Sequence, residues 1–221
     1  MNLFVEQLWR YPVKTLAGER LETAELTENG IPGDRIVHVR GPEGVRTSRR
    51  QHHLLGLHGT LDPTGRPLID GHAWDSQEAL ALVQAAAGDD AELVAFDGLA
   101  RFDILPLLVA TDGAVAEFGR DVRRLRPNIV IGGVEGLAER QWEGAQLRIG
   151  DAVVWLDSLR GRCPMTTVDP DTLERDPDVL KDIGRRFRGR IALNADVLRP
   201  GTVSVGDAVK LVLPVAAEID A

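Results

Sequence analysis

Turns that contain glycine or proline interrupt this chain at short intervals and limit the length of every regular element. The 221 residues include 23 Gly and 12 Pro, which separate short apolar runs such as residues 36–40, 129–131 and 152–156. Short runs rich in β-branched residues are typical of strands, and such frequent breakers argue against an all-helical bundle. The sequence therefore predicts a mainly β (α+β) fold with many short strands and a few short helices.

The clearest helical pattern covers residues 75–88, with Asp75 at the N-cap position and Gly88 at the end. The Gly- and Asp-rich stretch that follows, up to residues 97–98, marks a seam between an N-terminal and a C-terminal unit. No long linker separates the two units, so we expect them to pack tightly against each other.

Charge and hydropathy exclude several classes of protein. A net charge of -8 and a pI near 5.2 argue against a protein whose main task is to bind nucleic acid, because that task requires a broad basic face. The first residues lack the pattern of a signal peptide, and no stretch approaches the roughly 20 apolar residues of a membrane span. We therefore expect a cytoplasmic protein with no membrane span, and a monomer as the default.

Cys163 is the single cysteine of the chain and lies in the turn-rich stretch that follows an apolar run. One cysteine excludes an intramolecular disulfide, an iron–sulfur cluster held by four thiolates and a Cys-rich zinc site in this chain. A thiolate with basic neighbours, here Arg160 and Arg162, is suited to bind a soft metal or to carry a persulfide. The alternative is a small buried apolar side chain.

Further positions are suited to bind an anion. Lys14 lies in a turn between two predicted strands, and the turn at residues 30–35 delivers Arg35 to the next strand. Thr111 and Asp112 precede a predicted helix, whose first amides and positive dipole end attract anions. N-capping by Thr111 or Asp112 is the simpler interpretation of that spacing.

Arg126 and Asn128 flank Pro127 at the start of a β-branched run. On a strand these two residues have the same parity, so both side chains are expected to face one pocket and to bind oxygens of a planar or phosphorylated ligand. Some arginines near Arg126 would instead complement the C-terminal end of the preceding helix.

Two other segments are basic. Residues 47–53 supply either an Arg or His to a pocket rim or a solvated loop, and the adjacent His52 and His53 would point to opposite faces of a strand and not chelate one metal. The cluster at residues 185–190 is interpreted as a solvated face.

Several separated segments together resemble one family. Residues 8–15 with Gly33–Arg35 resemble the N-terminal β-barrel module that accompanies MOSC (molybdenum cofactor sulfurase C-terminal) domains, whereas residues 126–131, 161–172 and 200–207 resemble the MOSC domain itself. The resemblance implies a MOSC β-barrel, residues 99–215, packed tightly against a β-barrel-like module, residues 1–98. It points to the group that includes the mitochondrial amidoxime-reducing components and their bacterial relatives.

The resemblance also implies a cofactor and its ligands. In this family the loop cysteine binds the molybdenum of a molybdopterin cofactor, which makes Cys163 the expected metal ligand and catalytic residue. The resemblance assigns cofactor-binding roles to Lys14, Thr15, Arg35, Thr111, Asp112, Arg126 and Asn128, and Arg162 is added because it adjoins Cys163. Family descriptions also associate the domain with pyridoxal phosphate. Thr15 and Gly161 depart from the family, where Ser is usual at the first position and frequent at the second.

The expected activity is a molybdenum-dependent reduction of an N-hydroxylated or N-oxide-type small molecule. Because a single cysteine cannot hold an iron–sulfur cluster, the electrons would come from a separate donor protein. Two alternatives use the same residues: a sulfurtransferase that carries a persulfide on Cys163, and a non-enzymatic carrier of the molybdenum cofactor. The absence of a second cysteine argues mildly against a sulfur relay.

Overall fold

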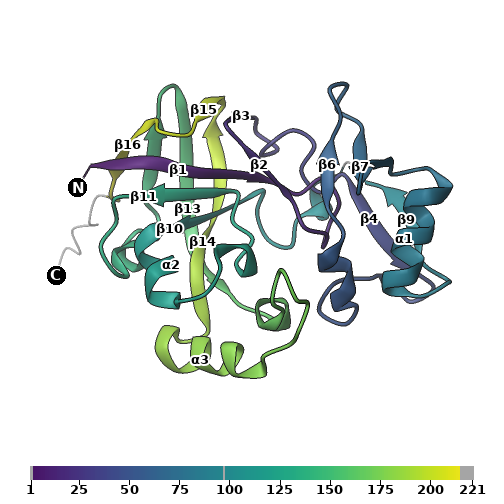
Figure 1. The fold of residues 1–221 in the computed structure, drawn as a ribbon. Coiled ribbons are helices and arrows are strands. Elements are labelled where there is room, and N and C mark those ends of the chain that lie inside the picture. Colours follow the sequence, from purple (N-terminus) through teal and green to yellow (C-terminus); the bar gives the residue numbers. More distant parts are fainter. Residues whose placement is uncertain (1, 97, 215–221) are drawn as a thin grey trace.

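The computed structural model describes residues 2–96 and 98–214, which form a large β-barrel and a smaller N-terminal module beside it (Figure 1). The strands are β1 (Leu3–Arg10), β2 (Glu19–Leu21), β3 (Thr23–Leu26), β4 (Val37–Gly41), β5 (Gly44–Val45), β6 (Gly59–Leu61), β7 (Pro67–Ile69), β8 (His72–Ala73), β9 (Glu92–Ala95), β10 (Leu107–Thr111), β11 (Ile129–Gly132), β12 (Gln146–Ile149), β13 (Ala152–Gly161), β14 (Arg190–Arg199), β15 (Gly201–Ser204) and β16 (Ala208–Val212). The α-helices in the described ranges are α1 (Gln77–Ala87), α2 (Asp112–Phe118) and α3 (Pro177–Phe187). The predicted mainly β fold with a few short helices is confirmed.

Seven strands close into a barrel in the order β11-β10-β14-β13-β12-β16-β1, and β11 pairs with β1 to complete the ring. Most pairs are antiparallel, but β10 and β11 run parallel, with Val109 opposite Ile129. Closure leaves no free edge on the ring. Strand β2 pairs with β1 outside the ring and leads the chain away from it.

The interior of the barrel is filled by the alternating apolar residues of its strands. Val5 and Leu8 of β1, Ile129 and Ile131 of β11, and Val154 of β13 are all fully buried in one cluster. The side-chain period of two places these residues inside, while their neighbours face outward.

Strand β1 belongs to the barrel although it comes from the N-terminal part of the chain. Leu3 pairs with Val209 of β16, and Val5 pairs with Ile131 of β11. The two halves of the chain are therefore interleaved. The division at residue 98 stays a prediction, and the predicted end at residue 215 lies outside the described residues.

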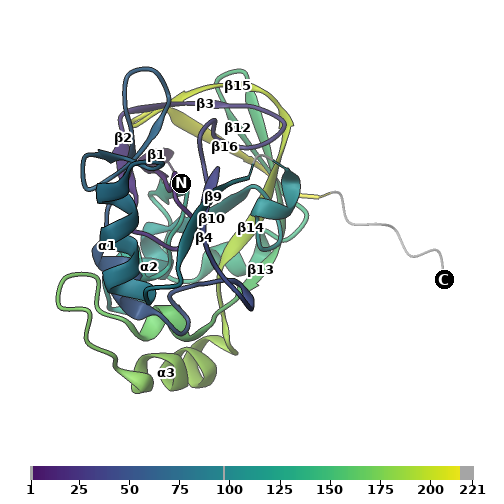
Figure 2. The same ribbon diagram turned by 90° about the vertical axis from the view of Figure 1, so that its right-hand side faces the viewer.

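The N-terminal module contains two three-stranded sheets, β5-β4-β9 and β6-β7-β8, together with helix α1 (Figures 1 and 2). Its own core includes Val39, Leu54, Ile69 and Val83. Helix α1 ends at Gly88, as predicted, but its N-cap is Ser76, whose side chain accepts a hydrogen bond from the backbone N–H of Ala79.

The predicted N-cap at Asp75 is therefore wrong by one residue. The Asp75 carboxylate instead accepts from Arg66 at 2.6 Å, outside the helix. Ser and Asp are comparably good N-caps, so composition alone did not distinguish the two neighbours.

Helices α2 and α3 cover the outside of the barrel near β10 and β14 (Figure 1). Helix α3 buries Val179, Ile183 and Phe187, which recur every four residues on one face and pack with Phe118 of α2. The charged cluster of residues 185–190 begins on the opposite face. None of the helices in the described ranges is long and apolar enough to cross a membrane.

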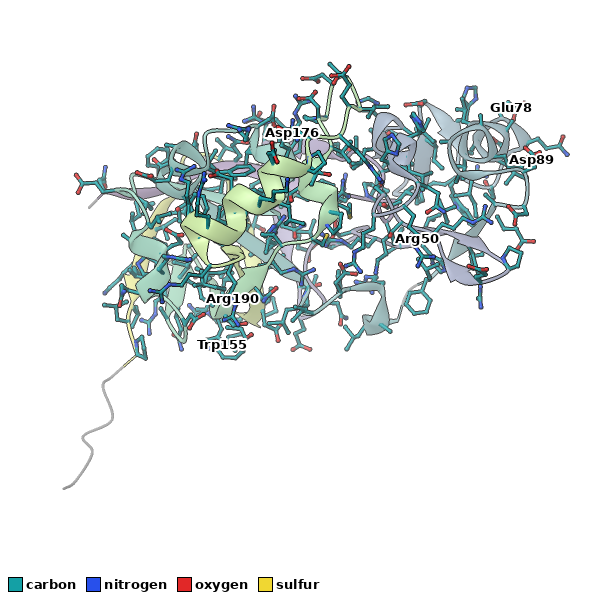
Figure 3. The ribbon with its side chains drawn as sticks, turned by 90° about the horizontal axis from the view of Figure 1, so that it is seen from below. Arg50, Glu78, Asp89, Trp155, Asp176 and Arg190 are labelled. Atoms are coloured by element: carbon teal, nitrogen blue, oxygen red, sulfur yellow. The ribbon has the colours of Figure 1, made fainter. Side chains whose placement is uncertain are left out.

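Figure 3 shows how the two bodies lie relative to each other. Trp155 and Arg190 mark the barrel, Glu78 and Asp89 mark the far end of the module, and Arg50 lies between them. The segments that meet at this junction carry the residues of the candidate site.

Candidate functional site

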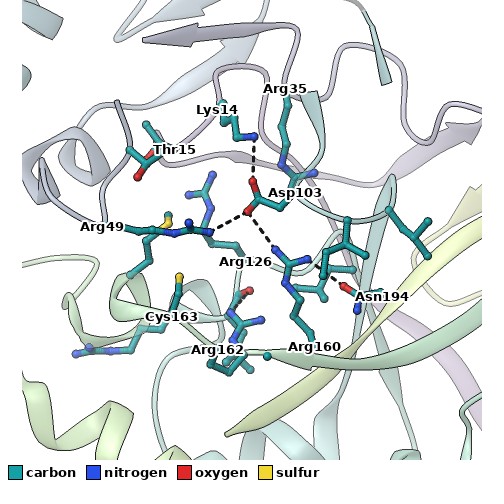
Figure 4. A pocket seen from close by; sticks show the side chains of 18 of the residues that line it. Lys14, Thr15, Arg35, Arg49, Asp103, Arg126, Arg160, Arg162, Cys163 and Asn194 are labelled. Carbon is teal, nitrogen blue, oxygen red and sulfur yellow. Dashed lines mark hydrogen bonds and ion pairs between the residues drawn. The ribbon is translucent and has the colours of Figure 1, made fainter. Parts of the chain in front are cut away.

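A cavity of about 350 Å³ lies where the N-terminal module meets the barrel (Figure 4). The module supplies a group of polar and cationic residues to its wall, namely Lys14, Thr15, Arg35, Thr47 and Arg49. The barrel and its loops supply Asp103, Arg124, Arg126, Arg160, Gly161, Arg162, Cys163, Met165 and Asn194, with several leucines. Because seven cations face a single carboxylate in this wall, the cavity is suited to an anionic ligand.

Cys163 lies at the point where β13 leaves the barrel. Strand β13 remains paired with β14 up to Gly161, and the backbone N–H of Arg162 still donates to the carbonyl of Gly189 at 2.9 Å. Pro164 then starts the 3₁₀ helix η5 (Pro164–Thr167), and Cys163 is its N-cap residue. The thiol is half-buried and lines the cavity, so it is accessible to a ligand and is not a fully buried core side chain.

The guanidinium of Arg162 is buried beside Cys163. Its Nη2 donates to the carbonyl of Leu125 at 2.7 Å, whereas its Nε is buried without a hydrogen-bond partner among the residues that the structure describes. Burial lowers the pKa of Arg162 to about 10, while the nearby Cys163 thiolate acts in the opposite direction. An acceptor atom inside the cavity would satisfy this orphaned donor.

Asp103 occupies the centre of the cationic wall. One carboxylate oxygen lies 3.0 Å from Lys14 Nζ, and the other lies 3.1 Å from Arg160 Nη2 and 3.5 Å from Arg49 Nη2 (Figure 4). Burial raises the pKa of Asp103, but the charges of Lys14, Arg160 and Arg49 outweigh burial, so the pKa lies below its ordinary value. The carboxylate is therefore ionised and holds the surrounding cations together.

Arg126 is held between the two bodies by the ring of Tyr11. The guanidinium lies 4.2 Å from the ring centroid, and its Nη1 donates to the carbonyl of Leu16 at 2.6 Å. Burial lowers the pKa of Arg126 to about 10. Arg35 is held by an ion pair with the buried Asp34, which also accepts from the backbone N–H of Tyr11 at 2.7 Å.

Three residues in the wall of this cavity have a strained backbone. Thr15, Arg35 and Arg126 have φ angles of 81°, 54° and 57°, in the left-handed region that non-glycine residues avoid. A β-branched residue such as Thr15 is particularly disfavoured there. Residues in such conformations persist where surrounding contacts fix them, and they cluster at ligand sites.

The structure brings most of the predicted residues together. Lys14, Thr15, Arg35, Arg126, Arg162 and Cys163 all line the cavity. Arg49 also lines it, in agreement with the pocket-rim interpretation of residues 47–53, but His52 and His53 do not. These two histidines lie on a 3₁₀ helix with ring centroids 4.2 Å apart, not on a strand as considered.

Thr111 and Asp112 lie outside the lining of the cavity. The Thr111 side chain accepts from the N–H of Ala114 and is the N-cap of α2. The Asp112 carboxylate accepts from the N–H groups of Gly113, Gly133 and Val134 at 2.7 to 2.9 Å. Both side chains serve the backbone, which matches the simpler N-capping interpretation. The cofactor-binding role that the resemblance implies for Thr111 and Asp112 stays a prediction.

Asn128 also lies outside the cavity lining. Its amide oxygen accepts from the N–H of Leu108, and its amide nitrogen donates to the carbonyl of Trp9, so it joins β10 to β1. The expectation that Arg126 and Asn128 face one pocket is wrong because Arg126 has a positive φ. The period of two applies only to extended backbone.

Sequence reasoning did not find Asp103 or Asn194. Asn194 is almost fully buried in β14, and its Oδ1 accepts from Arg160 Nη1 at 3.1 Å. Its position as the one polar residue in the apolar run 191–195 could have indicated a buried amide, which requires hydrogen-bond partners. Asp103 lies in a loop with no motif, and only the fold brings it to the cations.

No group of three His, Cys, Asp or Glu side chains within residues 2–96 and 98–214 is arranged to hold a metal ion. Cys163 is the soft ligand that this wall offers, so a metal there would depend on ligands of its own cofactor.

A closed β-barrel with a cationic cavity around a half-buried thiol defines a class of ligand-binding protein. The profile of the "MOSC domain" matches residues 111–210, and that of the "MOSC N-terminal beta barrel domain" matches residues 2–92. The chain belongs to the MOSC family, and the resemblance seen in the sequence is confirmed.

The chain is similar to two proteins whose names describe an activity. The mitochondrial amidoxime reducing component 2 of Macaca fascicularis is 36% identical, over 76% of this chain and 67% of the relative. The human mitochondrial amidoxime-reducing component 1 is 26% identical, over 94% of this chain and 82% of the relative. Among solved structures, the YUAD protein of Bacillus subtilis shares the fold, with a TM-score of 0.55, 14% identity and coverage of 97% and 98% of the two chains.

Proposed function

We propose that the cavity binds the molybdenum cofactor, that Cys163 is a molybdenum ligand, and that the protein reduces N-hydroxylated or N-oxide-type small molecules. The observation that carries this proposal is the half-buried thiol of Cys163 in a wall of seven cations and one carboxylate. The family and the names of the amidoxime-reducing relatives support it.

The donor set of the cavity fits the chemistry of this cofactor. The cofactor carries a phosphate, and Lys14, Arg35 and Arg49 are cations on the module side of the cavity. Its pterin ring presents N–H donors, for which the Asp103 carboxylate is an acceptor. Its dithiolene-bound molybdenum is soft enough to accept a thiolate.

Electrostatics also favours an anionic ligand. Burial lowers the pKa values of Arg126 and Arg162 to about 10, which means that their charged forms are poorly solvated in the ligand-free protein. An anion in the cavity would compensate these charges, and the free Nε of Arg162 would gain an acceptor.

When bound, the cofactor would supply the two-electron redox chemistry of the reaction. The overall change is R–NH–OH plus two electrons and two protons to R–NH2 and water, with the electrons from a separate donor protein. The protein would supply Cys163, beside Arg160 and Arg162, as a ligand, and would neutralise the cofactor with the remaining cations. The roles given to Lys14, Thr15, Arg35, Arg126, Arg162 and Cys163 are part of this proposal.

The proposal is tested on protein purified from a host that makes molybdopterin. Molybdenum and pterin are measured in the native protein, in Cys163→Ala and in Lys210→Ala, an exposed control on β16. We expect about one molybdenum per chain in the native protein and the control, none in Cys163→Ala, and reduction of an N-hydroxylated substrate with reduced methyl viologen as donor.

Other results would contradict the proposal in distinct ways. Cyanide-labile sulfur on Cys163 without molybdenum would identify a sulfurtransferase, and bound molybdenum without turnover would identify a carrier. An absorbance band of a lysine Schiff base would identify pyridoxal phosphate, for which Lys14 is the lysine in the wall. Fractionation and sedimentation of the same protein would test the predicted cytoplasmic location and monomeric state.

A further inference from the structure

A groove of about 710 Å³ opens on the surface of the barrel and shares no lining residue with the cavity that contains Cys163. We call it the arginine groove, and it is lined by Arg140, Gln141, Glu143, Leu159, Arg186, Arg188 and Arg190. Figure 3 shows Arg190 on the same body as Trp155, apart from the junction that Arg50 marks. Four guanidinium groups and one carboxylate line the groove, although the whole chain has a net charge of -8.

The end of helix α3 brings three of these arginines together. Arg186 lies in the last turn of α3, and the chain then reverses through Arg188 and Gly189, which have φ angles of 54° and 77°. Strand β14 starts at Arg190, which pairs with Gly161 of β13. This tight reversal places Arg186, Arg188 and Arg190 around one groove.

Arg140 completes the groove from a different part of the chain. It belongs to the 3₁₀ helix η4 (Ala138–Gln141), and its Nη2 donates to the carbonyl of Phe187 at 2.5 Å. Arg186 is held by Asp182, with 3.0 Å between its Nη1 and the carboxylate. These contacts fix two guanidinium groups before any ligand binds, which lowers the entropic cost of binding.

The other two arginines are unpaired within the described parts of the chain. The exposed side chains of Arg188 and Arg190 form no hydrogen bond or ion pair with any residue that the structure describes. Glu143, the carboxylate of the lining, already accepts from the backbone N–H of Leu159 at 2.7 Å. Like charges that are gathered without a counter-charge repel one another. An anion in the groove would relieve this repulsion and accept charge-assisted hydrogen bonds.

Complementation of the helix dipole explains only part of this cluster. Basic side chains in the last turn of a helix complement its negative end, which accounts for Arg185 and Arg186. Arg188 lies beyond that turn in the left-handed region, where Gly or Asn is the usual residue because a larger side chain is strained there. Stability of the helix end therefore does not account for an arginine at this position.

The donor set is suited to phosphate groups. Every cation in the lining is an arginine, whose planar fork binds two oxygens of one phosphate at a time. The volume of about 710 Å³ has room for several phosphate groups. Among the described residues that line the groove none is aromatic, so it offers no stacking surface for a nucleotide base.

We propose that the arginine groove binds a chain of two or more phosphate groups, such as inorganic polyphosphate or the triphosphate of a nucleotide. Arg140 and Arg186 form the fixed part of this site, and Arg188 and Arg190 are free to close on the ligand. The site does not rest on the proposed function, because the groove and the Cys163 cavity have no lining residue in common.

The site is tested by titrating the full chain, purified from a host that makes molybdopterin, with inorganic tripolyphosphate. The backbone N–H signals of Gln141 and Gly189 in NMR spectra report on the groove, and that of Cys163 reports on the other cavity. We expect a saturable shift at Gln141 and Gly189, with an affinity that falls as salt is added. Absence of a saturable shift, or a shift confined to Cys163, would overturn the proposal.

Two variants with the same change in net charge assign the binding to the groove. Arg190→Gln removes a cation from the lining, whereas Arg185→Gln removes one from α3 outside it, where the side chain is 80% exposed. We expect tripolyphosphate affinity to fall roughly tenfold in Arg190→Gln and at most about twofold in Arg185→Gln. Equal losses would show that net charge alone governs binding and would overturn the site.

Arg188→Gly separates binding from folding. Glycine adopts a positive φ without strain, so the midpoint of urea unfolding should not fall, while tripolyphosphate affinity should fall roughly tenfold. This variant also covers a failure of Arg190→Gln to fold. A native affinity in Arg188→Gly would contradict the role of Arg188 in the site.

Two further ligands distinguish the source and the chemistry of the bound anion. Equal affinities for ATP and tripolyphosphate would identify the phosphate chain as the whole ligand, and tighter binding of ATP would identify a nucleotide. N-acetylated tetraglutamate carries a similar charge on carboxylates along a flexible chain, which must be ordered on binding, so it should bind more weakly. Equal or tighter binding of tetraglutamate would identify an acidic protein segment as the occupant and would overturn the phosphate assignment.

Discussion

Arg162 has a buried charge that is costly for stability and that a bound anion would compensate. Its guanidinium is buried, its pKa is lowered by burial, and its Nε has no partner in the described parts of the chain. A buried charge with an unpaired donor contributes little to folding, so the role that we propose for Arg162 is in ligand binding.

We therefore predict that Arg162→Met changes the free energy of unfolding by no more than about 1 kcal/mol, since a lost hydrogen bond to Leu125 is offset by a relieved desolvation penalty. Molybdenum content should fall at least roughly tenfold. Urea unfolding and metal analysis measure the two quantities. Gly161→Ser is the matched control in the same wall, because an added Cβ meets no atom within 4 Å. A native metal content in Arg162→Met would refute the role of Arg162.

Asp103 makes the stability of the protein depend on pH. Its pKa in the folded protein lies below the ordinary value of 3.8, so its ionisation stabilises the fold. This contribution is complete above 3.8 and is lost as the pH falls from 3.8 through the folded pKa.

Asp103→Asn should accordingly destabilise the protein at about pH 7, by at most about 1 kcal/mol because the carboxylate is 40% exposed. The difference between native and variant should vanish at pH values well below 3.8. Urea unfolding at both pH values measures it. A difference that persists in acid would show that the effect comes from packing and not from charge.

At the scale of elements, the helix N-termini show how local chemistry sets the boundaries. Helix α1 is capped by Ser76, whereas its neighbour Asp75 is engaged with Arg66. Ser76→Ala should lower the free energy of unfolding by about 1 kcal/mol, because it leaves the N–H of Ala79 without its acceptor. Asp75→Ala, the neighbouring control, should have a smaller effect, since the Arg66 pair is exposed. Equal losses in urea unfolding would mean that both side chains share the capping role.

The elements also explain which predictions from the sequence were right. The short apolar runs predicted strands correctly, because alternation and turn residues act locally. Cys163 was found because it is the single cysteine of the chain, and Arg126 because it precedes Pro127 at the start of a β-branched run. Asn128 was misplaced because the positive φ of Arg126 breaks the strand parity, and no sequence pattern encodes that angle. Asp103 was missed because its role arises from long-range contact with Lys14 and Arg160.

For the whole molecule, the important fact is that the barrel and the module share one continuous framework. Strand β1 is one of the strands of the barrel. Tyr11, which follows it directly, contacts Arg126 and the carbonyl of Pro127. The cavity for which we propose cofactor binding is formed jointly by both bodies. Separation of the two would dismantle the site.

We predict a single cooperative unfolding transition, with the calorimetric enthalpy equal to the van't Hoff enthalpy. Ligand bound between the two bodies should raise the midpoint of that transition without splitting it. Differential scanning calorimetry of ligand-free and molybdenum-loaded protein measures both quantities. Two resolved transitions in the ligand-free protein would contradict this view and would indicate that the module folds independently.

The closure of the barrel by β1 has a consequence for the order of events during biosynthesis. Strand β1 pairs with β11 and β16, and its residue Leu3 meets Val209. At typical rates of synthesis, roughly 10 to 40 s pass between the appearance of these two residues. Throughout that interval β1 lacks its partner β16, so the ring of the barrel closes only after the last strand has been synthesised.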